Sequence, residues 1–175
     1  MTNKEKFYIK DIFEIQSTGL DKKINDNEQI VPMVNFMDVY NQNKDIHSFF
    51  VTSGTPIAIE KNLVIDKDII VTLSSEDPND IFESLVIENP KNVKLVYSYH
   101  TSRLRIKRMF DPYYLDYYFK NNRWKKQMSR LACGSTRFVI SKSDFSKTSI
   151  SIHNDVKIQQ KIGSFFIILL SFSLI

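Results

Sequence analysis

The sequence predicts an α+β fold, a mixed domain in which many short strands precede a basic helix. Three observations support this prediction. Between residues 30 and 97, short runs of β-branched and aliphatic residues alternate with polar breaks, as in strands joined by loops. From Asp111 onward, aromatic and apolar residues recur at helical spacing instead. With 42% hydrophobic residues, only four glycines and five prolines, the 175-residue chain can bury a core of ordinary size.

The strands are predicted from apolar runs bounded by turn residues. Residues 7–15 fit either a short strand or one helical turn. The run at residues 30–34 reads as a strand, and Pro32 argues for an edge position because proline donates no ladder hydrogen bond. A break at Asp66 and Lys67 separates two of the later runs. Further strands are predicted at residues 49–51, 57–59, 62–65, 68–73, 82–87 and 93–97.

One helix is predicted from Asp111 to near Gly134. Asp111 can cap its first turn, where Pro112 is well tolerated, and glycine is a common helix terminator. Its aromatic residues could be taken for a platform that stacks bases, but at helical spacing we favour packing in the core. These aromatic residues are Tyr113, Tyr114, Tyr117, Tyr118 and Trp124.

Charge is distributed unevenly along the chain, although the net charge is only +4. Residues 1–100 hold 10 Lys and Arg against 16 Asp and Glu, whereas residues 101–150 hold 12 against 3. A basic block of this kind is typical of a surface that faces a polyanion such as DNA or RNA. The alternative is a solvated basic face that the acidic half balances in the folded protein.

The sequence carries no recognisable catalytic motif. It has no phosphate-binding loop, dinucleotide-binding turn, zinc-binding HExxH pair or nucleophile elbow. The three histidines are scattered, and Cys133, the single cysteine, is interpreted as a buried or incidental thiol. One cysteine and no signal peptide predict a cytoplasmic protein, and no cofactor is expected.

Two alternatives of another class depend on particular residues. Asp66 and Asp68 with Lys94 could serve a metal-dependent nuclease, but two carboxylates at a turn are ordinarily solvated charges. The uncharged run at residues 162–175 suggests a small membrane-associated protein. It is only 14 residues long, whereas a span needs about 20.

Several segments, in order, resemble the target-recognition domain of type I restriction–modification specificity subunits. Residues 100–108 are similar to its basic strand, residues 111–120 to its tyrosine-rich helix, and residues 134–145 to its Gly-[Ser/Thr] turn and final strand. Weaker similarity lies at residues 12–17, 32–39, 66–71 and 159–166, the last resembling the start of the family's long conserved helix. The resemblance thus covers about residues 7–166.

The resemblance implies a non-catalytic subunit that directs other subunits to DNA. Such a subunit holds two recognition domains that each bind half of a split double-stranded target. Methyltransferase and restriction subunits then perform the chemistry with S-adenosylmethionine and ATP. This chain would supply one half, and a second half-specificity subunit would supply the other. The residues expected to contact DNA are Arg103, Arg105, Lys107, Arg108, Lys125, Lys126, Arg130, Ser135, Thr136 and Arg137.

The end of the chain departs from the family pattern. Residues 151–160 lack the prolines that usually lead into the conserved helix, and an apolar run replaces its alternating charges after Phe166. We therefore expect a recognition domain at residues 1–152, followed at residues 153–175 by the start of the conserved helix with a divergent, truncated end. The target bases cannot be predicted from these residues.

Overall fold

The computed structural model describes residues 4–17, 31–42, 54–55, 60–91 and 93–172. Its strands are β1 (Lys4–Tyr8), β2 (Phe13–Ser17), β3 (Val31–Val34), β4 (Gly54–Thr55), β5 (Ile69–Thr72), β6 (Ser74–Ser75), β7 (Ser84–Val86), β8 (Val96–Tyr97), β9 (Thr101–Ile106), β10 (Phe138–Val139) and β11 (Ser149–His153). Its helices are α1 (Ile9–Ile12), α2 (Phe36–Tyr40), the 3-10 turn η1 (Glu60–Asn62), α4 (Pro112–Phe119), α5 (Asn122–Leu131), α6 (Lys142–Lys147) and α7 (Val156–Phe172). The predicted α+β class is confirmed.

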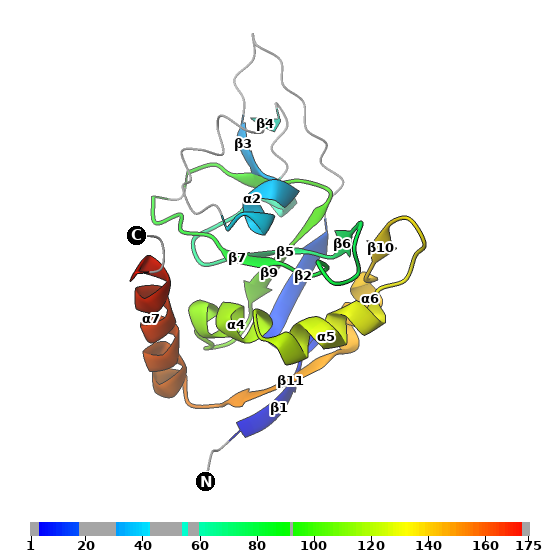
Figure 1. The fold of residues 1–175 in the computed structure, drawn as a ribbon. Coiled ribbons are helices and arrows are strands. Elements are labelled where there is room, and N and C mark those ends of the chain that lie inside the picture. Colours follow the sequence, from blue (N-terminus) through cyan, green and yellow to red (C-terminus); the bar gives the residue numbers. More distant parts are fainter. Residues whose placement is uncertain (1–3, 18–30, 43–53, 56–59, 92, 173–175) are drawn as a thin grey trace.

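A four-stranded antiparallel sheet in the order β2-β9-β5-β7 forms the centre of the molecule. All four residues of β5 are buried, because both faces of this sheet are covered. Ile69 and Val71 belong to the core cluster beneath the helices, whereas Ile70 belongs to the cluster on the opposite face. Figure 1 shows the resulting layers, with α4 and α5 on one side of the sheet and α2 on the other.

Aromatic rings fill the layer between the sheet and the helices. Phe82 contacts three rings, those of Phe119, Trp124 and Phe145, at centroid distances of 5.3–5.4 Å. Trp124 and Tyr114 are almost fully buried. Core packing of the helix aromatics is therefore confirmed for these two, and Tyr113 and Tyr118 pack against the same cluster while partly buried. The prediction is wrong for Tyr117, which is exposed.

The second layer contains a small sheet in the order β4-β3-β8, together with α2, which packs against β5 and β7 of the central sheet. Asn35 caps α2, because its side chain accepts hydrogen bonds from Met37 N and Asp38 N. In turn, Asp38 Oδ2 accepts a hydrogen bond from Asn35 N. The predicted edge position of the Pro32 strand is wrong, because β3 lies between β4 and β8. Pro32 is paired with Gly54 of β4, and the parallel pairing with β8 begins only at Met33. The proline nitrogen therefore does not need to donate a hydrogen bond to β8.

The helix predicted from Asp111 to near Gly134 is two helices. Asp111 caps α4 as expected, its carboxylate accepting from Tyr114 N at 2.8 Å. The helix is interrupted at Lys120 and Asn121. There the Asn121 side chain accepts a hydrogen bond from Trp124 N at 2.8 Å and caps the start of α5. Asparagine competes well for such a cap, which is why apolar spacing alone did not reveal the break.

Other predicted strands differ in detail. Residues 7–15 contain parts of two strands joined by the single turn α1, so both alternatives for this segment occur. The strand predicted at residues 62–65 is wrong, because Asn62 ends η1 and residues 63–65 form no strand. Strands were found within residues 68–73, 82–87 and 93–97, whereas residues 49–51 and 57–59 lie outside the described residues.

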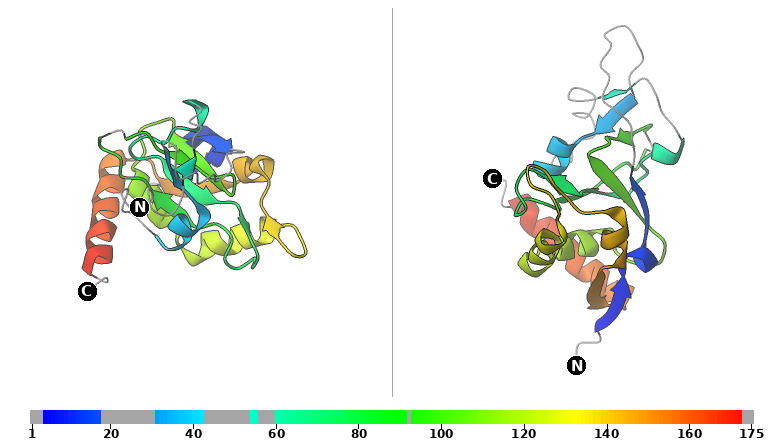
Figure 2. Two further views of the ribbon diagram at one scale, coloured as in Figure 1. Left: turned by 90° about the horizontal axis from the view of Figure 1, so that it is seen from above. Right: turned by 90° about the vertical axis from the view of Figure 1, so that its right-hand side faces the viewer.

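The start of the described chain lies beside the strand that leads into α7, because β1 pairs with β11 along five residues. From there α7 runs up against α4, on the side of the molecule away from β10 (Figures 1 and 2). Gln159 is fully buried in this joint, where its side chain accepts from Asp111 N at 2.9 Å and donates to His153 O at 2.6 Å. Gly163 lets the helices approach closely, since a Cβ there would lie 2.3 Å from Asp111 Oδ1.

Candidate nucleic-acid interface

Arg103 on β9 points into the protein and not toward solvent. The residue is 2% exposed, and its Nη2 donates to Glu14 Oε1 at 2.9 Å. Its Nη1 donates to Leu63 O at 2.6 Å and Lys61 O at 3.3 Å. The prediction that Arg103 contacts DNA is therefore corrected, because its guanidinium holds the segment after η1 against the central sheet.

Arg105, two residues further along β9, faces the same segment, as residues two apart in a strand do. Its Nε and Nη2 donate to the two carboxylate oxygens of Asp68 at 2.9 and 2.7 Å. The hydrogen bonds that Arg105 donates to this carboxylate raise the pKa of Arg105 above its ordinary value. Nη2 also donates to Leu63 O at 3.2 Å. Arg105 is thus committed to internal partners, although about a third of its side chain remains exposed.

Two of the predicted lysines also have partners within the chain. Lys107 Nζ donates to Lys10 O at 3.0 Å, and Lys125 forms an ion pair with Glu83. Arg108 is exposed and has no carboxylate within ion-pair distance among the described residues. The basic block in the sequence thus separates into cations with internal partners and cations whose charge is available to a ligand.

Helix α5 carries a row of available cations. Its buried side consists of Trp124 and Met128, which belong to the main core. Arg123, Lys126 and Arg130 are exposed, and their spacing of three and four residues places them on one face. None of the three has a carboxylate partner in the described ranges. We call these three residues the α5 row.

Sequence reasoning missed Arg123, although the signal for it was present. It lies three residues before Lys126 and seven before Arg130, which is the repeat of one helical face. Lys125 lies next to Lys126 in the sequence but on another side of the helix, where it meets Glu83. The position of each lysine around the helix axis, and not the basic composition of the segment, decides which of the two has an internal partner.

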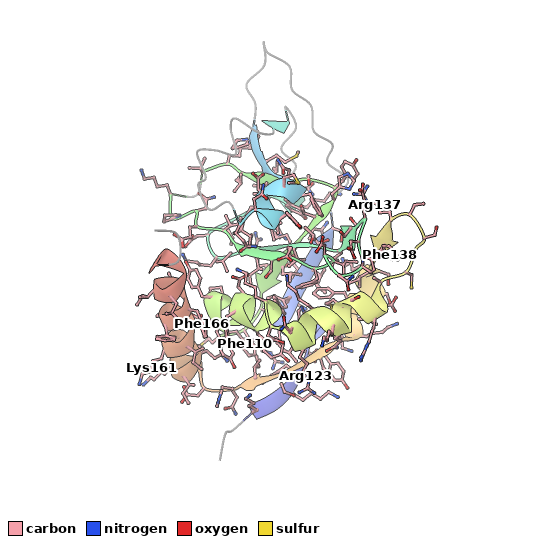
Figure 3. The ribbon with its side chains drawn as sticks, in the orientation of Figure 1. Phe110, Arg123, Arg137, Phe138, Lys161 and Phe166 are labelled. Atoms are coloured by element: carbon pink, nitrogen blue, oxygen red, sulfur yellow. The ribbon has the colours of Figure 1, made fainter. Side chains whose placement is uncertain are left out.

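A tight turn follows α5 and presents the other predicted residues. Cys133 and Val139 close it with reciprocal backbone hydrogen bonds of 3.0 and 2.9 Å. Gly134 adopts φ +145°, and a Cβ there would lie 2.0 Å from Arg137 O, so only glycine fits. Ser135, Thr136 and Arg137 are exposed at its tip. We call residues 133–139 the Gly134 turn; Figure 3 shows Arg137 beside β10, beyond the C-terminal end of α5.

The α5 row and the Gly134 turn both present hydrogen-bond donors without acidic partners among the described residues. Their exposed guanidinium and ammonium groups are those of Arg123, Lys126, Arg130 and Arg137. Unpaired like charges attract mobile anions, and a polyanion that replaces them gains from their release. This arrangement can bind phosphates, and the arginine at a rigid turn can reach a base edge.

The carboxylates considered for a nuclease are committed to structural contacts. Asp68 is 2% exposed and, besides Arg105, accepts from Ile65 N at 2.9 Å. Asp66 accepts from Asn89 N at 2.7 Å, in a turn where Lys67 takes φ +65°. Within the described ranges, no group of three or more His, Cys, Asp and Glu residues could hold a metal ion. The two carboxylates do lie at a turn, but their interpretation as solvated charges is wrong for Asp68, which is buried and paired with Arg105.

Two further expectations concern Cys133 and the apolar end. Cys133 is exposed at the base of the turn, so of the two alternatives, a buried or an incidental thiol, the buried one is wrong. Its Sγ lies 3.7 Å from Leu131 O. None of the helices in the part of the chain that the structure describes is long and apolar enough for a membrane span.

Comparison with protein families gives a match over residues 1–173 to the family described as the type I restriction modification DNA specificity domain. The chain belongs to this family. The resemblance drawn from its ordered motifs is thereby confirmed, as is its function as a DNA specificity domain of a type I restriction–modification system. No curated protein matches the chain.

Solved structures show the same fold for this specificity domain. The S subunit of a type I restriction–modification system from M. genitalium aligns with a TM-score of 0.64 and 14% identity, covering 95% of this chain and 39% of that one. The HsdS subunit from Thermoanaerobacter tengcongensis aligns with a TM-score of 0.59 and 11% identity, covering 93% and 36%. A third structure, from work on complex assembly and conformational transition of the type I R-M system, aligns with a TM-score of 0.66 and 12% identity. The alignment covers 97% of this chain and 38% of that one. The chain spans less than two fifths of these relatives.

Proposed function

We propose that this specificity domain recognises double-stranded DNA through the α5 row and the Gly134 turn. The observation that carries the proposal is the separation of paired from unpaired cations. Arg103, Arg105 and Lys125 are held by carboxylates, whereas the α5 row has no such partner in the described ranges. Exposed cations that the fold does not neutralise are the groups that DNA phosphates would neutralise.

The two parts of this surface suit different contacts. The α5 row lies on one helix face, and its long side chains can follow a phosphate backbone without reading sequence. Arg137 lies at the tip of a turn that Gly134 and the Cys133–Val139 pair hold in one shape. A guanidinium placed this way can donate two hydrogen bonds to guanine O6 and N7 in the major groove. We therefore assign base readout to Arg137, assisted by Ser135 and Thr136.

The length of the relatives supports a proposal about the larger assembly. Since the chain spans less than two fifths of the solved S subunits, we propose that it supplies one recognition half. A second half-specificity subunit would supply the other, and methyltransferase and restriction subunits would modify and cleave the DNA. Phe165, Ile168 and Leu169, which are exposed on α7, support this helix as the attachment to such partners.

The test is DNA binding by the purified chain over a range of salt concentrations, followed by fluorescence anisotropy. Arg137→Ala is expected to change which duplexes are selected from a random pool, with a loss of about tenfold on the preferred site. Lys126→Ala is expected to weaken binding to all duplexes and to reduce the salt slope by about 0.9. Lys161→Ala, an exposed lysine on α7, serves as the control.

Three results would contradict the proposal. The first is binding that does not weaken with salt, since phosphate contacts release counterions. The second is a loss for Lys161→Ala equal to that for Lys126→Ala, which would indicate a response to net charge alone. The third is an unchanged set of selected duplexes for Arg137→Ala, which would remove base readout from the turn.

A further inference from the structure

A groove of about 630 Å³ lies beside α5 and is not explained by the surface described above. Residues of α4 and α5 form one wall, strands β1 and β11 form another, and Ile162 of α7 closes one end. On β11, buried Ile150 and Ile152 alternate with Ser149, Ser151 and His153, which line the groove. The strand therefore presents a polar side to this space.

The lining of the groove is rich in hydrogen-bond donors. Lys4 and Arg123 contribute positive charge, Asn121 and Gln127 contribute amides, and Ser149 and Ser151 contribute hydroxyls. Within the described part of the chain no Asp or Glu lines it. Lysine, arginine, serine, asparagine, glutamine and tyrosine are the side chains that contact phosphate and sugar in protein–DNA complexes. The chemistry of the lining matches an anionic ligand with many acceptor oxygens.

The groove is continuous with the α5 row. Arg123 and Gln127 also line the neighbouring hollow of about 580 Å³, which Lys126 and Arg130 border. In addition, the ten-residue helix α5 begins at the groove, where Asn121 caps it. Its positive N-terminal end therefore adds to the field of Lys4 and Arg123.

We propose that this groove is a phosphate-binding subsite for DNA that flanks the bases approached by the Gly134 turn. The inference rests on the proposed function and extends it from Arg123, which belongs to the α5 row, to Lys4 and the polar side of β11, at the end of α5 opposite the turn. Ten helical residues span about 15 Å, which corresponds to roughly four base pairs at 3.4 Å each. The groove thus holds the DNA backbone about four base pairs away from the bases that the Gly134 turn contacts.

An acidic protein segment is the competing occupant. Two observations favour DNA. The groove shares Arg123 with a row of cations that extends along α5, so an occupant of one would meet the other. Its neutral donors outnumber its cations, and amides and hydroxyls suit the many oxygens of a sugar–phosphate chain.

The test combines variants with duplexes of different length. A preferred duplex is first selected from a random pool, and one flank is then shortened in steps of two base pairs. Arg123→Ala is expected to lose about five- to tenfold in affinity on the full duplex, with a salt slope smaller by about 0.9. After the flank is cut by four to six base pairs, the variant and the parent should bind equally.

A second variant tests the groove from another element. Ser151→Asp places a negative charge on β11 within the groove and should cause the same length-dependent loss. Ser164→Asp, at an exposed serine of α7, is the matched control and should cause none. Far-ultraviolet circular dichroism shows whether each variant is folded.

The outcomes separate this inference from the proposed function. A loss at Arg123 or Ser151 that is the same for every duplex length, or no loss, overturns the groove as a flanking subsite. If Arg137→Ala still changes the selected duplexes, the proposed function stands without it. Displacement of the duplex from wild type by polyglutamate, with Arg123→Ala insensitive to it, would assign the groove to an acidic protein segment. Failure of the parent chain to bind any duplex would overturn both.

Discussion

Replacement of Gly134 by alanine should open the turn that presents Arg137. The added Cβ would lie 2.0 Å from Arg137 O and 2.9 Å from its carbonyl carbon, which are backbone atoms of the same turn. The φ of +145° adds strain for any residue with a Cβ. The turn can relieve both only by giving up the Cys133–Val139 pair, which is joined by two backbone hydrogen bonds.

The decrease in the free energy of unfolding is limited to the two backbone hydrogen bonds that are lost when the turn opens. Two hydrogen bonds contribute about 1 kcal/mol each, so the free energy of unfolding should fall by about 2 kcal/mol. For a chain of this length, that corresponds to a decrease in Tm of roughly 4–8 °C. Affinity for DNA should fall to the level of Arg137→Ala, because the arginine is no longer held in place.

Urea unfolding and fluorescence anisotropy measure the two effects. Ser135→Ala is the matched control, since its side chain is exposed at the tip and its change leaves the backbone free of overlap. The reasoning is refuted if Gly134→Ala unfolds at the same urea concentration as the parent and binds DNA equally well. A decrease in stability without a decrease in affinity would show that Arg137 does not depend on the turn.

Asp68→Asn removes the charge that Arg105 meets in a partly buried ion pair, and the free energy of unfolding measured in urea should fall by about 2–3 kcal/mol; an unchanged value would contradict a structural role for this pair. Gly163→Ala would place a Cβ 2.3 Å from Asp111 Oδ1, so α7 should separate from α4 and its amides should exchange faster with deuterium, with unaltered exchange as the contrary result. Burial raises the pKa of Tyr97 to about 12, so it contributes stability below pH 10 that is lost as the pH rises from 10 to 12. Urea unfolding at pH 9 and 11.5 should show this decrease, and a smaller one for Tyr97→Phe; equal decreases in the two proteins would contradict it.

Much of the fold could be predicted because its layers depend on apolar periodicity. The run at residues 68–73 is mostly apolar, and β5 within it is buried on both faces as such a run predicts. The break between α4 and α5 was missed because it depends on a single side chain, Asn121, acting as a cap. The position of β3 was missed for a similar reason. Proline prevents a backbone hydrogen bond only where a neighbouring strand would accept one from its nitrogen. The pairing with β8 begins one residue later, at Met33, and no local sequence pattern reveals this.

The candidate site was predicted less well, because basic composition does not reveal which charges the fold neutralises. Arg103 and Arg137 are equally basic in the sequence, yet one is enclosed by Glu14 and two carbonyls whereas the other is exposed. The partners of Arg103 lie 40 to 89 residues away, and only tertiary structure brings them together. Local rules could have identified Arg123, because helical phase alone places it with Lys126.

The paired arginines have a consequence for how this surface can vary. Arg103 and Arg105 join β9 to the segment of residues 61–68, so their replacement would disturb packing before it changed any contact with DNA. Arg137 has no partner that the described fold needs, and its turn is held by backbone bonds and by Gly134. A side chain at such a position can change without loss of the fold. If the proposed function is correct, new target specificity should therefore arise from substitutions at positions 135–137, while the arginines of β9 stay fixed.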